Sequence, residues 1–285
     1  MNYIVGIGEI LWDVLPDGKR LGGAPANFAF HASQAGLHGI LLSAICFDSL
    51  GKETSDELVK LNLDNILIVS DFPTSTVNIT VDSNGIPSYE ITENVAWDHL
   101  AFVPSFKKIA EEARAACFGT LAQRSKASHD AIHAFLRAMP ADSLRVFDIN
   151  LRQNYYSKDI IEESLYIANI LKINDEEIET LTPMLSLGNG GYEARCRQII
   201  SDYNLKFVVL TCGANGSYVF AADGKTSFLP TPKVKVVDTV GAGDSFTATF
   251  VASLVKGETL TEAHKKAVDV AAFVCTKHGA MPKHR

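Results

Sequence analysis

Residues 238–246 read Asp238-Thr239-Val240-Gly241-Ala242-Gly243-Asp244-Ser245-Phe246. The stretch follows an extended segment, Lys233 to Val237, and opens an apolar helical pattern from Ser245 to Lys256. Small residues at a helix N-terminus let backbone N–H groups converge on an anion, with the helix dipole behind them. We therefore predict that Gly241, Ala242 and Gly243 form an anion cradle, which can hold the charge that develops on a phosphoryl group during its transfer.

Asp244 places a carboxylate directly beside this predicted cradle. A negative charge is unfavourable next to a bound phosphate unless it is needed to contact the incoming nucleophile. Its natural role is then to orient an alcohol and accept its proton. The structural alternative is a tight glycine turn in which Asp244 caps the helix, and the stretch alone does not separate the two interpretations.

Other phosphate-binding motifs are not supported by the sequence. Gly6-Ile7-Gly8 resembles the opening of a dinucleotide-binding GxGxxG motif, but Leu11 occupies the third glycine position and no helical pattern begins there. No GxxxxGK[ST] stretch occurs in the chain, which excludes P-loop chemistry.

Short apolar runs alternate with longer helical patterns along the chain, which indicates a layered α/β domain with a mostly parallel sheet covered on both faces. A single domain spanning residues 1–285 is the prediction. The expected helices include Ser49 to Leu61, Lys126 to Met139, Ile160 to Ala168 and Val268 to Thr276. The expected strands are Tyr3 to Gly8, Ile40 to Ile45, Ile66 to Val69, Ala115 to Gly119, Arg145 to Ile149, Ile170 to Ile173 and Phe207 to Thr211.

Two segments interrupt this alternation and predict a small β lid, formed by residues of about 9–21 and 73–98. Ser75 to Asp82 and Ser88 to Thr92 alternate apolar and polar residues around Asn84-Gly85, a dipeptide suited to a tight hairpin turn. Ile10 to Leu21 adds a further strand in this prediction. Because a hairpin of this kind exposes strand edges, we expect a homodimer that pairs the two lids.

Composition limits the partners and the compartment. The net charge of −7 and the lack of clustered Lys and Arg argue against nucleic acid and favour a small-molecule substrate. The five cysteines are widely spaced without zinc-site spacing, so they are expected to be reduced. No apolar run reaches the ~18 residues of a membrane span and no export signal is visible, which predicts a cytoplasmic protein.

Two motifs together resemble the ribokinase-like (PfkB) family of carbohydrate kinases. The stretch DTVGAGDSF matches the family signature DTxGAGD, and Gly22-Gly23-Ala24-Pro25-Ala26-Asn27 matches its N-terminal GGxxxN signature. The resemblance extends over essentially the whole chain, and it implies a three-layer α/β/α fold and an ATP-dependent sugar kinase that uses MgATP. Three further stretches look most like bacterial fructokinases: Gly8 to Asp13 (GEILWD), Phe118 to Arg124 (FGTLAQR) and Phe147 to Arg152 (FDINLR).

The resemblance implies a role for each matching position at the sugar site. Asp13 resembles the acidic residue that holds two sugar hydroxyls, and Gly23 and Asn27 resemble the rest of the sugar-binding floor. A carboxylate accepts paired O–H bonds, an amide donates and accepts, and glycine permits close approach. In the family, other residues line the site between the sugar and the phosphates, and Arg124, Asn150 and Arg152 are similar to them.

The nucleotide and metal positions come from the same resemblance. Asn174 and Glu177 match the NxxE element that places Mg²⁺ through water around the phosphates, although Asn-x-x-Glu is also a plausible capping box. Thr211, Gly213 and Gly216 match the TxGxxG nucleotide loop, for which a plain β-turn is the alternative.

A monovalent cation site, for K⁺ in many relatives, corresponds to Asp238, Val240 and Gly279. Lys283 departs from potassium-dependent relatives, which often have a small polar residue there. Its ammonium group could replace the ion.

Fructose is the expected acceptor among free sugars. The alternatives within kinases are 2-keto-3-deoxygluconate, ribose or a nucleoside, and a base would need lid aromatics such as Phe72, Tyr89 and Trp97 for stacking. A different class is a catalytically silent sugar-binding regulator, against which the intact Asp244 and its cradle argue.

Overall fold

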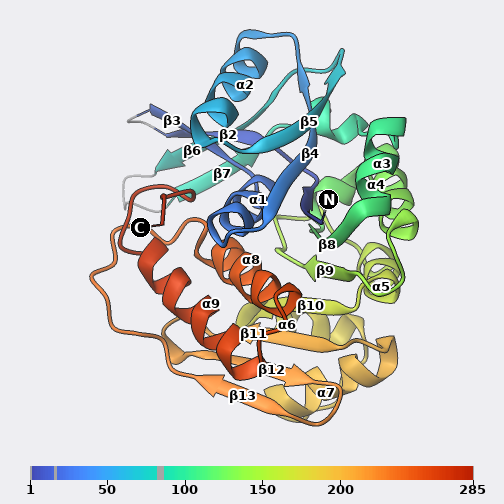
Figure 1. The fold of residues 1–285 in the computed structure, drawn as a ribbon, viewed down its shortest axis with the longest axis vertical. Helices are drawn as coiled ribbons and strands as arrows, with labels where there is room; N and C mark the ends of the chain where they lie inside the picture. The colour runs from blue at the N-terminus through green and yellow to red at the C-terminus, as the bar shows by residue number, and fades with distance from the viewer. Residues whose placement is uncertain (1, 16–17, 82–86, 285) are drawn as a thin grey trace.

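The computed structural model describes residues 2–15, 18–81 and 87–284. Within these residues the main element is a nine-stranded sheet, parallel from β5 to β11 and antiparallel at β12 and β13 (Figure 1). Across the sheet the strands are β13 (Thr226–Leu229), β12 (Ser217–Ala221), β11 (Phe207–Thr211), β10 (Ile170–Asn174), β9 (Leu144–Asp148), β8 (Ala113–Phe118), β1 (Tyr3–Ile7), β4 (His38–Cys46) and β5 (Asp64–Ser70).

Helices cover both faces of this sheet, so the predicted three-layer α/β/α fold is confirmed. One face packs against apolar side chains such as Phe28 and Val251, and the other against side chains such as Phe135 and Leu165. The first helical layer contains α1 (Ala24–Gln34), α2 (Ser49–Leu61), α8 (Ala242–Val255) and α9 (Leu260–Val274); the second contains α3 (Pro104–Glu112), α4 (Lys126–Ala138), α5 (Lys158–Ile167), α6 (Asp175–Met184) and α7 (Tyr192–Tyr203).

A second, four-stranded sheet lies beside the first one, in the order β3 (Gly18–Gly22), β2 (Leu11–Leu15), β6 (Ser75–Val81) and β7 (Pro87–Ile91). We call these four strands the lid sheet. The predicted stretch from Ile10 to Leu21 joins this sheet, but it forms two strands instead of one, because residues 18–22 pair antiparallel with β2. The predicted Asn84-Gly85 turn lies outside the described residues. Trp12 anchors the lid sheet by donating from Nε1 to Thr54 Oγ1 on α2 at 2.9 Å.

Two helix boundaries differ from the sequence prediction. Helix α8 begins at Ala242 rather than Ser245, because Gly241 has a left-handed φ of 77° and the following small residues already form the first turn. Helix α9 begins at Leu260, where Thr259 and Glu262 form a capping box, and the predicted Val268 to Thr276 covers only its second half.

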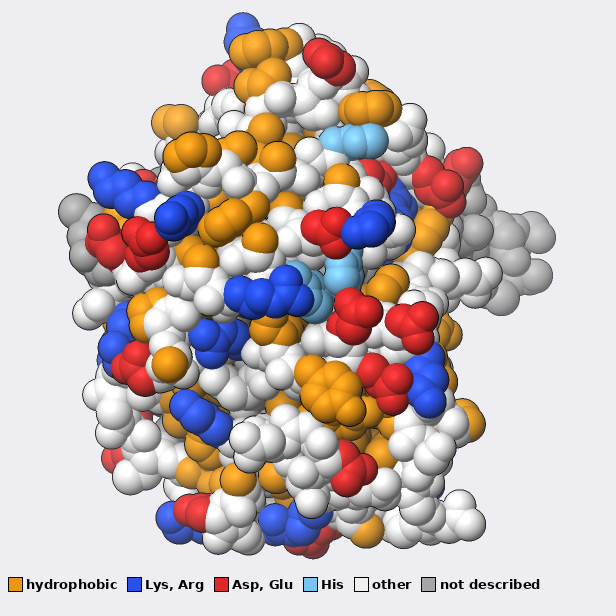
Figure 2. Space-filling view, turned by 90° about the vertical axis from the view of Figure 1, so that its right-hand side faces the viewer, with side chains coloured by type: hydrophobic (Ala, Val, Ile, Leu, Met, Phe, Trp, Pro, Cys, Tyr) orange, Lys and Arg blue, Asp and Glu red, His pale blue; other side chains and the backbone are white. Residues whose placement is uncertain are grey.

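The surface carries both signs of charge. Figure 2 views the side covered by α3, α4 and α5, where Lys and Arg side chains are interspersed with Asp and Glu. All five cysteines are unpaired, with Cys117, Cys196 and Cys212 buried. In the described part of the chain, no helix has the length and apolar character needed to cross a bilayer.

Candidate active site

The predicted site residues gather at the carboxyl edge of the parallel strands, where α/β proteins bind their ligands. Asn174 ends β10 and Thr211 ends β11, while Asn150 follows β9. Asp244 reaches the same edge from the first turn of α8. Loops and helix starts from distant parts of the sequence therefore meet at one end of the sheet.

Asp244 is held by Asn27 rather than by its own helix. Asn27 Nδ2 donates to Asp244 Oδ2 at 2.7 Å, across 217 positions of sequence. The N-cap of α8 is Gly241, with no side-chain cap hydrogen bond. This geometry disfavours the interpretation of Asp244 as a helix cap and aims its carboxylate at the sugar floor.

The electrostatic surroundings bring the pKa of Asp244 into the range of a general base. Burial of the carboxyl group is the main cause and, with the negative charge of Asp148, raises this pKa to about 6. The hydrogen bond from Asn27 and the charges of Lys172 and Arg152 oppose the rise. A base with a pKa near the working pH is well placed to accept a hydroxyl proton.

Steric contacts around the cradle explain its glycines. A Cβ on Gly241 would stand 2.6 Å from Ala280 Cβ, and one on Gly243 would stand 3.2 Å from Lys172 Nζ. The N–H of Ala242 already donates to Thr239 O at 3.2 Å, so it serves the turn. Donors for an anion are therefore expected at Gly241 and Gly243, whose N–H groups lie at a helix start without a helical acceptor.

A buried ion pair below the cradle was missed from the sequence. Lys172 Nζ lies 3.1 Å from Asp148 Oδ1, and Thr247 Oγ1 donates to Asp148 Oδ2 at 2.9 Å. Lys172 and Asp148 are direct neighbours in the β9–β10 register. The available signal was a charged residue inside each of two adjacent apolar strands, since buried charges require partners.

Asp13, Gly23 and Asn27 lie together as the predicted sugar floor. The Asp13 carboxylate lies against Gly22, where a Cβ would stand 2.8 Å from Asp13 Oδ2. Gly23 has a φ of 113°, and a Cβ there would stand 2.6 Å from Glu9 O. Burial raises the pKa of Asp13, against the charges of Arg152 and Arg20. Within the described structure, buried Asn27 Oδ1 has no hydrogen-bond partner, which leaves it free to accept from a hydroxyl.

Glu9 is a second acidic residue that the sequence analysis did not identify. It follows β1, is 4% exposed, and its Oε2 has no hydrogen-bond partner among the described residues. Burial, together with the charge of Asp244, raises the pKa of Glu9 to about 7. The signal was a carboxylate placed directly after an apolar strand at the ligand-binding edge.

Most of the hydrogen-bonding capacity of Arg124 is used within the protein, which the sequence did not predict. It lies in the 3₁₀ helix η2 (Leu121–Arg124) and makes a bidentate pair with Asp98, with both N–O distances 2.8 Å. Its Nη2 also donates to Thr92 O at 2.7 Å, which leaves Nη1 as the nitrogen available to a ligand. The assignment of Arg124 to the space between sugar and phosphates stays a prediction.

Arg152 and Asn150 lie in the loop after β9. Arg152 is exposed, yet its charge lowers the pKa of Glu9, Asp13 and Asp244, so its guanidinium faces the acidic side of the site. Asn150 has a left-handed φ of 44°. Such a conformation in a non-glycine residue is often found at binding sites.

Asn174 and Glu177 form the capping box of α6. Asn174 Oδ1 accepts from Glu177 N at 2.8 Å, and Glu177 Oε2 accepts from Asn174 N at 2.9 Å. Glu177 Oε1 also accepts from Leu151 N at 3.0 Å. Both oxygens of the Glu177 carboxylate therefore already accept a backbone N–H, and each keeps one lone pair. This arrangement fits a Mg²⁺ ion held through its water ligands better than one bound directly.

The predicted nucleotide loop is a turn between β11 and β12. It contains the 3₁₀ helix η3 (Gly213–Asn215), and Gly213 and Gly216 both have positive φ angles. Thr231 Oγ1 donates to Gly213 O at 2.6 Å, which ties the following segment to the loop. The exposed Gly213 leaves its backbone open to solvent, as a phosphate-contacting loop requires.

The residues of the predicted cation site also lie together. Asp238 accepts from Val240 N at 3.0 Å and from Gly279 N at 3.1 Å, which joins the cradle loop to the C-terminal segment. Lys283 is exposed, and the nearby cation at Asp238 is Arg20, at 3.7 Å. Replacement of K⁺ by the Lys283 ammonium group is therefore not supported by this arrangement.

Comparison with known proteins agrees with this fold. The profile of the pfkB family carbohydrate kinases matches residues 16–284. An uncharacterized sugar kinase from Pyrococcus horikoshii has a TM-score of 0.84 at 26% identity over 98% of this chain and 94% of that chain, and a second structure of it contains ATP. Fructokinase-2 of Oryza sativa is 28% identical over 99% of this chain and 90% of its own. The fold of a Vibrio cholerae fructokinase is also shared, with a TM-score of 0.83 at 24% identity over 99% and 96% of the two chains.

The fold and the site define a phosphotransferase with an alcohol group as acceptor. The chain belongs to the pfkB family of carbohydrate kinases. It is a sugar kinase.

Proposed function

We propose that the chain transfers the γ-phosphoryl group of MgATP to a hydroxyl of free fructose. The observation that carries the proposal is the position of Asp244, which is held by Asn27 at 2.7 Å and lies beside the Gly241–Gly243 cradle. Asp244 orients the hydroxyl and accepts its proton, while the cradle and the α8 dipole stabilise the charge on the phosphoryl group. The identity to plant fructokinases supports fructose as the acceptor.

The magnesium ion that accompanies ATP would be held through water by Asn174 and Glu177. Its chemistry is to neutralise the phosphate charges as the bond to the leaving group breaks. The chain's own task is to keep the hydroxyl, Asp244 and the cradle aligned. A monovalent cation such as K⁺ near Asp238, Val240 and Gly279 remains part of the proposal, and its contribution would be to the charge at the cradle.

Two observations make the other acceptors less suitable. A sugar acid needs an available cation, but the guanidinium of Arg124 is already neutralised by Asp98, and that of Arg152 faces the carboxyl groups of Glu9, Asp13 and Asp244. A nucleoside needs an exposed aromatic platform, but Trp97 is fully buried and Phe72 stacks on His99, with ring centroids 3.5 Å apart. The side chain of Tyr89 lies outside the described residues. A silent regulator would have no physical need for the base at position 244.

An ADP-release assay with a panel of acceptors tests the proposal. The panel contains fructose, glucose, ribose, 2-keto-3-deoxygluconate and adenosine, each at several concentrations with saturating MgATP. We expect the highest kcat/KM with fructose. A higher value for another acceptor would reassign the substrate, and ATP binding without turnover on any acceptor would favour the silent regulator.

A further inference from the structure

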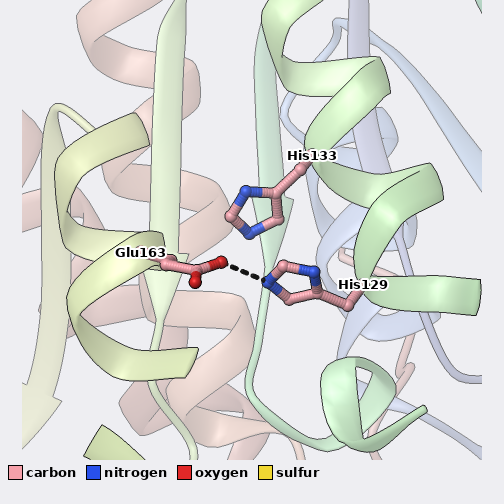
Figure 3. A group of neighbouring side chains, drawn as sticks. All are labelled: His129, His133 and Glu163. Atoms are coloured by element: carbon pink, nitrogen blue, oxygen red, sulfur yellow. Dashed lines mark ion pairs between the residues drawn. The ribbon is translucent and has the colours of Figure 1, made fainter. Parts of the chain in front are cut away.

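A cluster of three potential metal ligands lies in the second helical layer, away from the Gly241–Gly243 cradle. His129 and His133 stand one turn apart on α4, and Glu163 faces them from α5 (Figure 3). Their ligand atoms all lie within 4.8 Å of one another. Among the residues that the structure describes, this is the one group of three His, Cys, Asp or Glu side chains that meets this condition.

His129 has a carboxylate at each ring nitrogen. Its Nε2 lies 3.1 Å from Glu163 Oε2, and its Nδ1 lies 3.4 Å from Asp130 Oδ1. A neutral imidazole carries only one proton, so when Nδ1–H donates to Asp130 the lone pair of Nε2 points at another acceptor. Either a second proton on Nε2 or a metal cation between Nε2 and Glu163 makes this arrangement favourable. A carboxylate on the second ring nitrogen is also the usual support of a metal-binding histidine.

His133 supplies the third donor. Its ring stacks on that of His129 with centroids 4.1 Å apart, and Figure 3 shows one of its ring nitrogens directed toward His129 and Glu163. His133 Nε2 also lies 3.0 Å from Gln123 Oε1. Binding an ion at His133 Nε2 would replace its hydrogen bond to Gln123 Oε1. That side chain would still donate to Gly119 O at 2.8 Å and to Ser164 Oγ at 2.9 Å.

We propose that His129, His133 and Glu163 bind one divalent transition-metal ion, with Zn²⁺ as the best match, and that this ion links α4 to α5. Tetrahedral ligands at Zn²⁺ bond lengths stand about 3.3 Å apart, which is close to the His129–Glu163 distance of 3.1 Å. Two imidazoles favour Zn²⁺ over Mg²⁺ or Ca²⁺, which prefer oxygen. The Glu163 side chain is 58% exposed, so an ion can reach the three side chains and a water molecule can fill its fourth coordination position.

The test measures metal binding directly, without nucleotide or sugar. The untagged chain is stripped with a chelator and titrated with Zn²⁺ by calorimetry, and with Co²⁺ while the visible absorption is recorded. We expect one Zn²⁺ per chain and a Co²⁺ spectrum of low coordination number. His129→Ala and Glu163→Gln change accessible side chains, and each should weaken Zn²⁺ binding by about tenfold or more.

His38→Ala is the matched control, because His38 also pairs with a carboxylate on the surface, Asp64 at 2.6 Å. It should leave Zn²⁺ affinity unchanged, and circular dichroism confirms that each variant folds. Unchanged binding in His129→Ala would overturn the proposal, as would a thiolate-type Co²⁺ spectrum that assigns the ion to cysteines. Absence of stoichiometric binding in the native chain would show that His129 and Glu163 form an ion pair only.

Discussion

The carboxylate of Asp244 is the residue on which the chemistry depends. Asp244→Asn keeps the size and one acceptor oxygen but cannot take a proton. Turnover should fall by roughly two to four orders of magnitude while ATP affinity is retained. In a loose transition state the hydroxyl is still largely protonated when the bond to ADP breaks, so Asp244 acts first by orientation. Near-native turnover of this variant in the ADP-release assay would contradict the mechanism.

The pKa of Asp244 predicts an acid limb in the pH profile. Only the carboxylate form accepts a proton, and its pKa is about 6, so kcat/KM should fall about tenfold per pH unit well below 6 and level off above it. Asn27→Ala removes a hydrogen bond that lowers this pKa. The acid limb should therefore move to higher pH.

Glu9 provides the control for this pH profile. Its pKa of about 7 means that Glu9 is mostly uncharged on the acid limb. Glu9→Gln imitates the uncharged form, so the limb should stay in place. Profiles of kcat/KM from pH 5 to 8 on the native chain, Asn27→Ala and Glu9→Gln separate the two carboxyl groups. An acid limb that moves in Glu9→Gln would show that the titrating group is Glu9 and not Asp244.

Asp13 should act on sugar binding rather than on the nucleotide. It lies on β2 beside Gly22, away from the cradle loop in sequence and in its own sheet. Asp13→Ala removes hydroxyl contacts, so the KM for sugar should rise far more than the KM for ATP. Asp142→Ala, which removes an exposed partner of Arg114, is the control. Equal sugar KM values in Asp13→Ala and the native chain would remove Asp13 from the site.

At the scale of elements, the start of α8 is the most constrained. Gly241 combines a φ of 77° with a Cβ position 2.6 Å from Ala280, whereas a Cβ on Gly243 would stand 3.2 Å from Lys172 Nζ, at the far end of a side chain. Gly241→Ala should therefore displace the C-terminal segment and lower the thermal midpoint. Gly243→Val should mainly weaken ATP binding and turnover, because its branched side chain enters the anion site. Thermal melts and ATP titrations of both variants measure the difference, and identical effects would show that the two glycines share one role.

The elements that could be predicted are those set by local pattern. Strand β4 has seven buried residues in a row and α2 has a regular amphipathic face, so both were predicted closely from the sequence. The start of α8 was misplaced because glycines have low helix propensity, and only the contacts with Ala280 and Lys172 fix them. Strand β3 was missed because Gly18–Gly22 is exposed in its first half and lacks a buried alternation.

The site shows the same division between local and long-range information. The motif residues were identified from sequence because their spacing resembles a known family. The Lys172–Asp148 and Arg124–Asp98 pairs depend on which strands and loops become neighbours, with separations of 24 and 26 positions. Nothing in the local sequence states that Arg124 is neutralised. Contacts of this kind decide which ligand charges the site accepts.

At the scale of the whole molecule, the lid sheet offers a surface for assembly. β3 and β7 are the edges of this sheet, and unpaired strand edges favour association with a second copy. Phe47 lies at the base of the lid sheet, since its neighbour Cys46 donates to Thr74 Oγ1 at 3.0 Å just before β6. Its side chain is 90% exposed, so it presents an apolar ring beside the lid sheet.

We therefore predict a homodimer that covers Phe47 and the lid edges. Sedimentation velocity at micromolar concentration should show a dimer, and Phe47→Glu should shift it toward monomer. Val59→Glu is the matched control, because Val59 is 76% exposed but lies in the last turn of α2, toward the opposite end of the sheet. A charge there should leave the dimer intact. If the native chain sediments as a fully active monomer, the lid works without a partner and the predicted dimer is wrong.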